Sequence, residues 1–188
     1  MPKLYSFNMV TLDGFFEGTE PWSIDWHNTD EEFNDFAIEQ LNTLGTILFG
    51  RLTYQGMAGY WPSPAAVESD PVVAGAMNNL NKIVISRTLE TADWNNTRLV
   101  KDNIADEIAR LKQQPGKDLA LFGSANLMST LMKLNVIDEH RLMVNPVVLG
   151  RGTPLFQGVD DRLALKLIGT RTFKNGNVLL TYQPTASA

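Results

Sequence analysis

The chain twice runs from a short apolar strand through a glycine into a helix, and this repeat limits the folds open to it. Residues 46–49 (TILF) are typical of a buried strand, Gly50 ends the run, and Arg51 begins a helical stretch. Residues 118–122 (DLALF) are followed by Gly123 in the same way. A helix start carries unpaired N–H groups and the positive end of the helix dipole, so both places suit a phosphate. An ordinary strand-to-helix turn has the same pattern, and both interpretations stay open.

Strand and helix patterns alternate through the first 135 residues, and strand patterns alone follow. We expect helices at 30–42, 52–60, 72–80, 104–113 and 123–133, and strands at 3–10, 46–49, 82–86, 98–100, 118–122, 136–148, 163–173 and 178–183. This order is typical of an α/β fold whose sheet is mostly parallel with an antiparallel edge. Since no linker or repeat interrupts the pattern, we expect one domain over residues 1–188, with a frayed tail at 184–188.

The composition excludes several classes of function. The net charge of -5 argues against a nucleic-acid partner. With no cysteine and two histidines, the 188 residues offer no thiolate site, and we expect no metal centre. No segment approaches the roughly 18–20 apolar residues of a membrane helix, and the N-terminus has no signal-peptide pattern. We therefore expect a cytoplasmic protein with no membrane partner.

The expected strands carry their most suggestive residues at their carboxyl ends, where open parallel sheets bind ligands. Five such ends are Leu12-Asp13-Gly14, Gly50-Arg51, Ser86-Arg87-Thr88, Gly123-Ser124-Ala125-Asn126 and Gly150-Arg151-Gly152. Together they form a rim with helix starts, hydroxyls and arginines, which suits a pyrophosphate and a further phosphate. Neither the G-x-G-x-x-G fingerprint nor the P-loop pattern occurs, so the usual dinucleotide fold is not indicated.

Five segments, in order and over nearly the whole chain, carry a family resemblance. They are VTLDGF (10–15), ILFGRLTY (47–54), IVISRTL (83–89), ALFGSANL (120–127) and DEHRLMVNPVVLGRGTPLF (138–156). The chain resembles the dihydrofolate reductase-like superfamily, in the branch similar to the reductase domain of riboflavin biosynthesis. The last segment favours this branch over true dihydrofolate reductase. The resemblance implies a three-layer α/β fold, with a mostly parallel central sheet, antiparallel C-terminal strands and helices on both faces.

The resemblance also implies NADPH as the cofactor. Carried over position by position, its binding residues are Gly50, Arg51 and Thr53 at the first helix start, Ser86 and Arg87 beside the adenosine 2′-phosphate, and Gly123, Ser124, Ala125, Asn126 and Leu127 at the second helix start. An arginine at the ribose agrees with this cofactor, because it accommodates a 2′-phosphate where an acid prefers a free hydroxyl.

Two further roles implied by the resemblance belong to acids. Asp13 matches the acid in the loop near the nicotinamide. True dihydrofolate reductases keep a carboxylate on the first helix, facing the substrate. Three acids stand at this place, Asp30, Glu31 and Glu32, and the sequence does not decide which of them aligns with that carboxylate. We take Glu31 as the candidate. The W-x-L-P-x-D pattern of that family is absent, which argues against dihydrofolate as the substrate.

Four other residues have two interpretations each. Trp22 and Trp26, two tryptophans in one polar loop, either line a pocket for a flat ring or cover a small core region. His27 either donates a proton near neutral pH or is solvated. Arg151 either meets a substrate phosphate or lies in solvent. We take Trp26 and Arg151 as candidate substrate-binding residues.

We therefore predict an NADPH-dependent reductase that transfers a hydride to a small pyrimidine- or pterin-like substrate. One candidate activity is the reduction of 5-amino-6-(5-phosphoribosylamino)uracil in riboflavin biosynthesis. The zinc deaminase signature of the bifunctional riboflavin enzyme requires cysteines, and this sequence has none. We therefore expect either a stand-alone reductase or a protein that has taken another substrate. The alternative is a nucleotide-binding or regulatory protein that keeps the fold without the chemistry. The apolar run 142–149 and the late strands also predict a homodimer.

Overall fold

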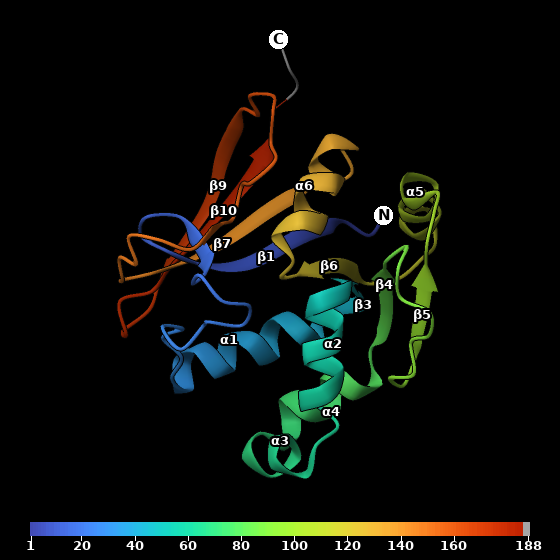
Figure 1. Cartoon of the computed structure of the whole chain (residues 1–188), viewed down its shortest axis with the longest axis horizontal. Coiled ribbons are helices and arrows are strands. Elements are labelled where there is room, and N and C mark those ends of the chain that lie inside the picture. The colour runs from blue at the N-terminus through green and yellow to red at the C-terminus, as the bar shows by residue number, and fades with distance from the viewer. Residues whose placement is uncertain (186–188) are drawn as a thin grey trace.

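A computed structural model describes residues 1–185, and its main feature is one large mixed sheet (Figure 1). The strands of this sheet are β1 Leu4–Thr11, β3 Leu44–Gly50, β4 Asn81–Ile85, β5 Thr97–Val100, β6 Asp118–Phe122, β7 Glu139–Asn145, β9 Leu165–Thr172 and β10 Val178–Pro184. Their order is β5-β4-β3-β6-β1-β7-β10-β9. Neighbours from β5 to β7 are parallel, whereas β10 is antiparallel to both β7 and β9. The predicted parallel sheet with an antiparallel C-terminal edge is confirmed.

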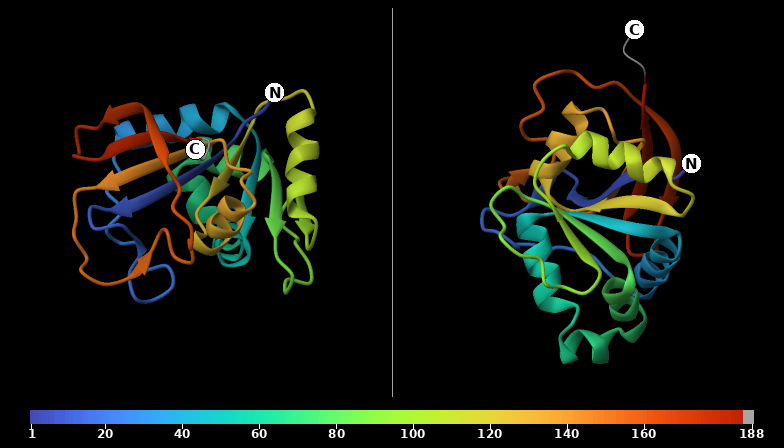
Figure 2. Two further views of the ribbon diagram at one scale, coloured as in Figure 1. Left: turned by 90° about the horizontal axis from the view of Figure 1, so that it is seen from above. Right: turned by 90° about the vertical axis from the view of Figure 1, so that its right-hand side faces the viewer.

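Helices cover both faces of this sheet, with α5 and α6 on one face and α1 to α4 on the other (Figure 2). Their bounds are α1 Glu31–Asn42, α2 Arg51–Tyr60, α3 Pro64–Ser69, α4 Pro71–Asn79, α5 Ile104–Gln113 and α6 Ala125–Lys133. Successive side chains of β3 point to opposite faces of the sheet, so this strand contributes to the hydrophobic core on each face. Leu48 packs with α5 and α6, while Ile47 and Phe49 pack with α1, α2 and α4. The three layers therefore follow from a strand that is apolar on both sides.

Several element boundaries differ from those predicted. The pattern missed α3 and the short pair β2 Phe15–Glu17 and β8 Thr153–Pro154, which form a separate two-stranded sheet. The long strand predicted at 136–148 is wrong, because β7 ends at Asn145. Pro146 has no N–H to give to a ladder, and the Val147 N–H donates locally to the Asn145 carbonyl.

The predicted frayed tail is wrong for its first two residues. Pro184 ends β10, and the Thr185 N–H donates to the Ala164 carbonyl at 2.9 Å. Residues 186–188 of that prediction lie outside the described part of the chain. Across residues 1–185, no helix has the length and apolar character needed to cross a membrane, and no three His, Asp or Glu side chains gather as metal ligands would.

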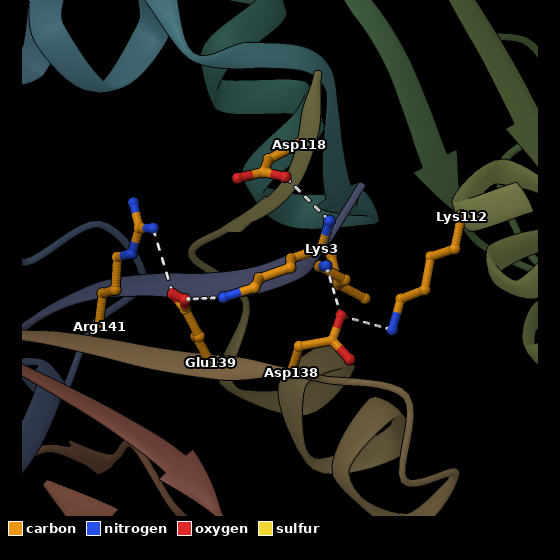
Figure 3. Close-up of polar contacts among 7 residues, drawn as sticks. Lys3, Lys112, Asp118, Asp138, Glu139 and Arg141 are labelled. Carbon is orange, nitrogen blue, oxygen red and sulfur yellow. Dashed lines mark hydrogen bonds and ion pairs between the residues drawn. The ribbon is translucent and has the colours of Figure 1, made fainter. Parts of the chain in front are cut away.

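Charged side chains hold the first strand at the amino end of the sheet (Figure 3). The Lys3 N–H donates to Asp118, and the Lys3 ammonium pairs with Glu139. The Leu4 N–H donates to Asp138 Oδ2 at 2.7 Å, and Lys112 Nζ lies 2.6 Å from the same oxygen. These bonds join β1 to the starts of its two neighbours β6 and β7, leaving the opposite, carboxyl edge of the sheet to carry a site.

Candidate active site at the carboxyl edge of the sheet

The first residues of α2 and α6 meet at the carboxyl edge of the sheet. A Cβ placed on Gly50 would lie 2.9 Å from Ser124 Cβ, and one placed on Gly123 would lie 3.0 Å from Thr53 Cγ2. Gly123 has a φ of 65°, which glycine adopts without strain. The structure thus brings together four predicted cofactor residues from segments about 70 positions apart, and two helix N-termini open onto one place.

The rest of the α6 start is also at this place. Ala125 and Asn126 line the cavity described below, and Asn126 Oδ1 accepts from Gln157 Nε2 at 2.8 Å. Leu127 is buried in the core, and its N–H donates to Ser124 Oγ, which caps the helix. Leu127 therefore supports the helix start from beneath and does not line the cavity.

The third predicted cofactor segment follows β4, the parallel neighbour of β3, so it ends at the same edge of the sheet. Ser86 Oγ accepts from the N–H groups of Thr88 and Leu89 and so shapes the turn. The Arg87 guanidinium lies 3.5 Å from Asp102, with both side chains more than two-thirds exposed. Such a pair is weak, so Arg87 remains accessible to an anion. Arg51, the first residue of α2, is also exposed.

Beside the two helix starts lies a cavity of about 380 Å³. It reaches the place where the sheet opens: pairing between β1 and β6 ends at Phe7 and Phe122, whereas β1 stays paired with β7 as far as Thr11. Most of the walls are apolar side chains of the helices, namely Phe33, Ala37, Leu41, Leu52, Met57, Trp61, Val73 and Met77. A cavity of this size and character suits a small flat ligand.

Trp22, in the loop after β2, closes part of this cavity over α2. A Cβ on Gly56 would lie 2.6 Å from Trp22 Cε2, so the indole lies directly on the helix backbone. Trp26, the predicted ring-binding residue, does not line the cavity. It donates from Nε1 to the Ser23 carbonyl and packs beside the core around Met9. The core interpretation of Trp26 therefore describes its position, and Trp22 takes the place predicted for it.

The predicted acids lie outside the cavity lining. Asp13 accepts from the Thr11 hydroxyl and from the N–H groups of Leu149 and Gly150, and these bonds lower the pKa of its carboxyl. The ionised Asp13 side chain thus links the loop after β1 to the loop after β7. Glu31 is exposed in the first turn of α1 and has no contact with the cavity, so the geometry offers no support for it as a proton donor.

The two neighbouring acids on α1 are occupied elsewhere. Asp30 caps the helix by accepting from the Phe33 N–H, and Glu32 accepts from the Lys174 N–H. The α1 side chains that do line the cavity include the uncharged Asn34 and Gln40. Among the described residues, α1 thus gives the cavity no carboxylate.

His27 lines the cavity, whereas Arg151 does not. Burial lowers the pKa of the His27 imidazole to about 4, so the ring is neutral at pH 7 and is no proton donor there. Arg151 is exposed, two residues before the start of β8. Sequence reasoning missed Asn8 and Gln40 as cavity residues, whereas lining a pocket was one of the two interpretations of Trp22. The glycine at position 56, within a helix, is the one signal in the sequence that a ring approaches there.

Comparison with known proteins gives this arrangement a family. Residues 2–179 match the profile of the RibD C-terminal domain. The chain belongs to the RibD C-terminal domain family. It is also 40% identical to the Bacillus subtilis protein named "Uncharacterized protein YyaP", over 92% of this chain and 90% of that one. The predicted family is confirmed.

Solved structures confirm the dihydrofolate reductase-like fold of this RibD-type domain. A putative riboflavin biosynthesis protein from Shewanella sp. PV-4 superposes with a TM-score of 0.73 at 21% identity, covering 98% of this chain and 99% of that one. Dihydrofolate reductase from Enterococcus faecalis, complexed with NADP(H) and RAB-propyl, gives 0.63 at 16% identity, covering 98% and 97%. Family and fold together support a reductase-like function.

Proposed function

We propose that this RibD-type domain is an NADPH-dependent reductase that acts on a small pyrimidine- or pterin-like heterocycle. The observation that carries the proposal is the meeting of the α2 and α6 N-termini beside an apolar cavity. Two helix dipoles directed at one place favour a pyrophosphate. The adjoining cavity has room for a flat ring.

The residues at the two helix starts fit such a cofactor. Gly50 and Gly123 leave the backbone of each helix start uncovered, because a side chain on either would run into the opposite segment. Arg51 and Arg87 are exposed at the same edge, and an arginine fork suits a phosphate. We assign Arg87 to the 2′-phosphate, which makes NADPH the preferred nicotinamide cofactor over NADH.

NADPH, when bound, would supply the hydride from nicotinamide C4, and a proton from solvent would complete the reduction of a C=N or C=O group of the substrate. The protein's own part is orientation and exclusion of water. Trp22 and the apolar helix faces keep the reacting ring away from solvent, and Thr53, Gly123 and Ser124 lie where the two ligands would meet. Solvent is assigned as the proton source because α1 gives the cavity no carboxylate among the described residues and the His27 imidazole is neutral. The two carboxylates that do line the cavity, those of Glu17 and Asp70, each accept from a backbone N–H.

The melting temperature with NADPH, with NADH and with neither tests the cofactor. A ligand at 100 times its Kd adds about 2.7 kcal/mol to the free energy of unfolding, which is several degrees for a domain of this size. We expect a larger rise with NADPH, and its loss when Arg51→Ala and Arg87→Ala are combined. Arg162→Ala, an exposed arginine in the loop near the far end of α6, is the matched control. Equal or absent shifts with the two cofactors would remove the assignment.

The second candidate, a nucleotide-binding protein without catalysis, is favoured by the lack of a carboxylate from α1 in the cavity. Fold alone does not decide between the two. Oxidation of NADPH, followed by absorbance with pyrimidine, pterin and carbonyl substrates, separates them. Turnover supports the reductase, and a melting shift without turnover on any of these supports the alternative.

A further inference from the structure

The cavity contains buried polar atoms that the protein leaves without partners. Within the described residues, six buried side-chain nitrogen or oxygen atoms lack a hydrogen bond, and three of them belong to cavity residues: Asn8 Oδ1, His27 Nε2 and Gln40 Oε1. Asn8 and Gln40 are only 2% and 6% exposed. Because an unpaired buried polar group is costly, such a set is expected to meet hydrogen-bonding groups of a ligand.

These three residues reach the cavity from different elements. Asn8 lies on β1, one residue beyond its last pairing with β6, and its amide nitrogen makes one contact, 3.4 Å from Met128 Sδ, a weak acceptor. Gln40 lies on the third turn of α1, and His27 lies in the loop before α1. The three unpaired atoms thus come from different walls of a cavity whose lining is mostly apolar, as in a site that recognises the edges of a flat ring.

The charges around the cavity exclude one ligand class. Among residues 1–185, no lysine or arginine lines it, whereas Glu17 and Asp70 do. Each of these acids accepts from one backbone N–H, of Trp22 and Val73 respectively, and so each is held in place. Away from the two helix starts, a phosphate inside this cavity would be desolvated near carboxylates with no cation to pair with it, which is unfavourable.

We infer that the substrate is an uncharged, unphosphorylated nitrogen heterocycle with amino or lactam groups, held at its polar edges by Asn8, His27 and Gln40. The inference rests on the reductase function proposed above and narrows its substrate. It disfavours the phosphoribosyl-substituted pyrimidine as the preferred ligand. The arginines of the rim serve the cofactor, and Arg151 lies outside the cavity.

A matched ligand pair tests this inference. The probes are 5-amino-6-(ribosylamino)uracil and its 5′-phosphate, which differ only in the phosphate. Each is titrated against the tryptophan fluorescence of the protein, both with and without NADPH. We expect the unphosphorylated probe to bind at least ten-fold more tightly. Tighter binding of the phosphate, lost on Arg151→Ala, would overturn the inference and give Arg151 the role of a phosphate ligand.

Two near-isosteric substitutions test the polar contacts. Asn8→Leu and Gln40→Leu should each weaken binding of the unphosphorylated probe ten-fold or more, while Gln113→Leu, on the exposed side of α5, should not. The NADPH melting shift of each variant checks that it is folded. Unchanged affinity in both variants would overturn the assignment of these residues. The wild-type protein could bind the two probes with different affinity and yet show no change of melting temperature with NADPH. That result would refute the proposed reductase function and keep the inferred class of ligand.

Discussion

Gly56 is a single residue whose missing side chain shapes the candidate site. Alanine is favoured over glycine within a helix by about 1 kcal/mol, yet a Cβ here would lie 2.6 Å from Trp22 Cε2 and closer still to Cζ2 of the same ring. We expect Gly56→Ala to displace the indole from α2, shift its fluorescence emission to the red and raise KM for the heterocycle several-fold. Emission spectra and steady-state kinetics measure the two effects.

Gly59 supplies the control within the same helix. A Cβ there meets nothing within 4 Å, so Gly59→Ala should raise the stability by up to about 1 kcal/mol without changing emission or KM. In a Trp22→Phe background, the emission change caused by Gly56→Ala should disappear. Identical behaviour of the two alanine variants would show that the indole does not rest on Gly56.

At the residue scale, the sequence was informative where backbone chemistry decides and misleading where packing decides. Gly50 and Gly123 were identifiable as the junctions of two strands with two helices, because a glycine there ends the apolar run and lets another segment come close to the backbone. Trp26 and Glu31 were predicted in the site from their positions along the sequence. Which ring or acid faces a cavity depends instead on the conformation of the loop and on the rotation of the helix about its axis. Both are tertiary properties.

At the scale of elements, the clearest periodicities predicted the bounds best. Helix α5 and strand β6 begin and end as expected, at Ile104–Gln113 and Asp118–Phe122. The short pair β2 and β8 was missed because two or three residues carry no period, and its pairing joins segments more than 130 residues apart. The opening between β1 and β6, which admits the cavity, is likewise invisible in a strand pattern that continues through Thr11.

The bonds that hold the start of β1 at the amino end of the sheet predict the effect of a substitution on stability (Figure 3). Asp138 accepts from the Leu4 N–H and pairs with Lys112, so Asp138→Ala leaves the start of the strand unanchored. We expect it to lower the free energy of unfolding by about 1–3 kcal/mol, as for hydrogen bonds to a charged group. Urea unfolding monitored by circular dichroism measures this loss.

A second ion pair on the surface serves as the comparison. Asp160 pairs with Lys133 at 2.8 Å, and both side chains are more than half exposed. Asp160→Ala should change the stability by no more than about 0.5 kcal/mol. Equal losses in the two variants would mean that the bond to the strand backbone adds nothing beyond a surface charge pair.

At the scale of the whole molecule, the interior strand β7 and the edge strand β9 differ in how much apolar surface they expose. The first half of the apolar run 142–149, one reason to expect a dimer, lies in β7, which is paired on both sides, and Met143 is fully buried. The edge strand β9 has two neighbouring exposed apolar side chains: Leu167 and Ile168 are 48% and 44% exposed beside an irregularity in the pairing with β10. An edge strand with exposed apolar side chains favours association.

We propose that a second copy of this chain covers β9. Light scattering at micromolar concentration should give about twice the 20.9 kDa mass of one chain. Replacing Leu167 and Ile168 together by lysine should yield a monomer, because the charges would be buried against the other copy. Val67→Lys, at an exposed valine on α3, should leave the dimer intact. A monomeric wild-type protein would refute the dimer, and dissociation by Val67→Lys alone would move the interface to the helical end of the molecule.

Since β9 lies at the edge of the sheet next to β10, away from the α2 and α6 starts, the monomeric variant should keep its NADPH melting shift. Loss of that shift would instead mean that the site requires the second copy.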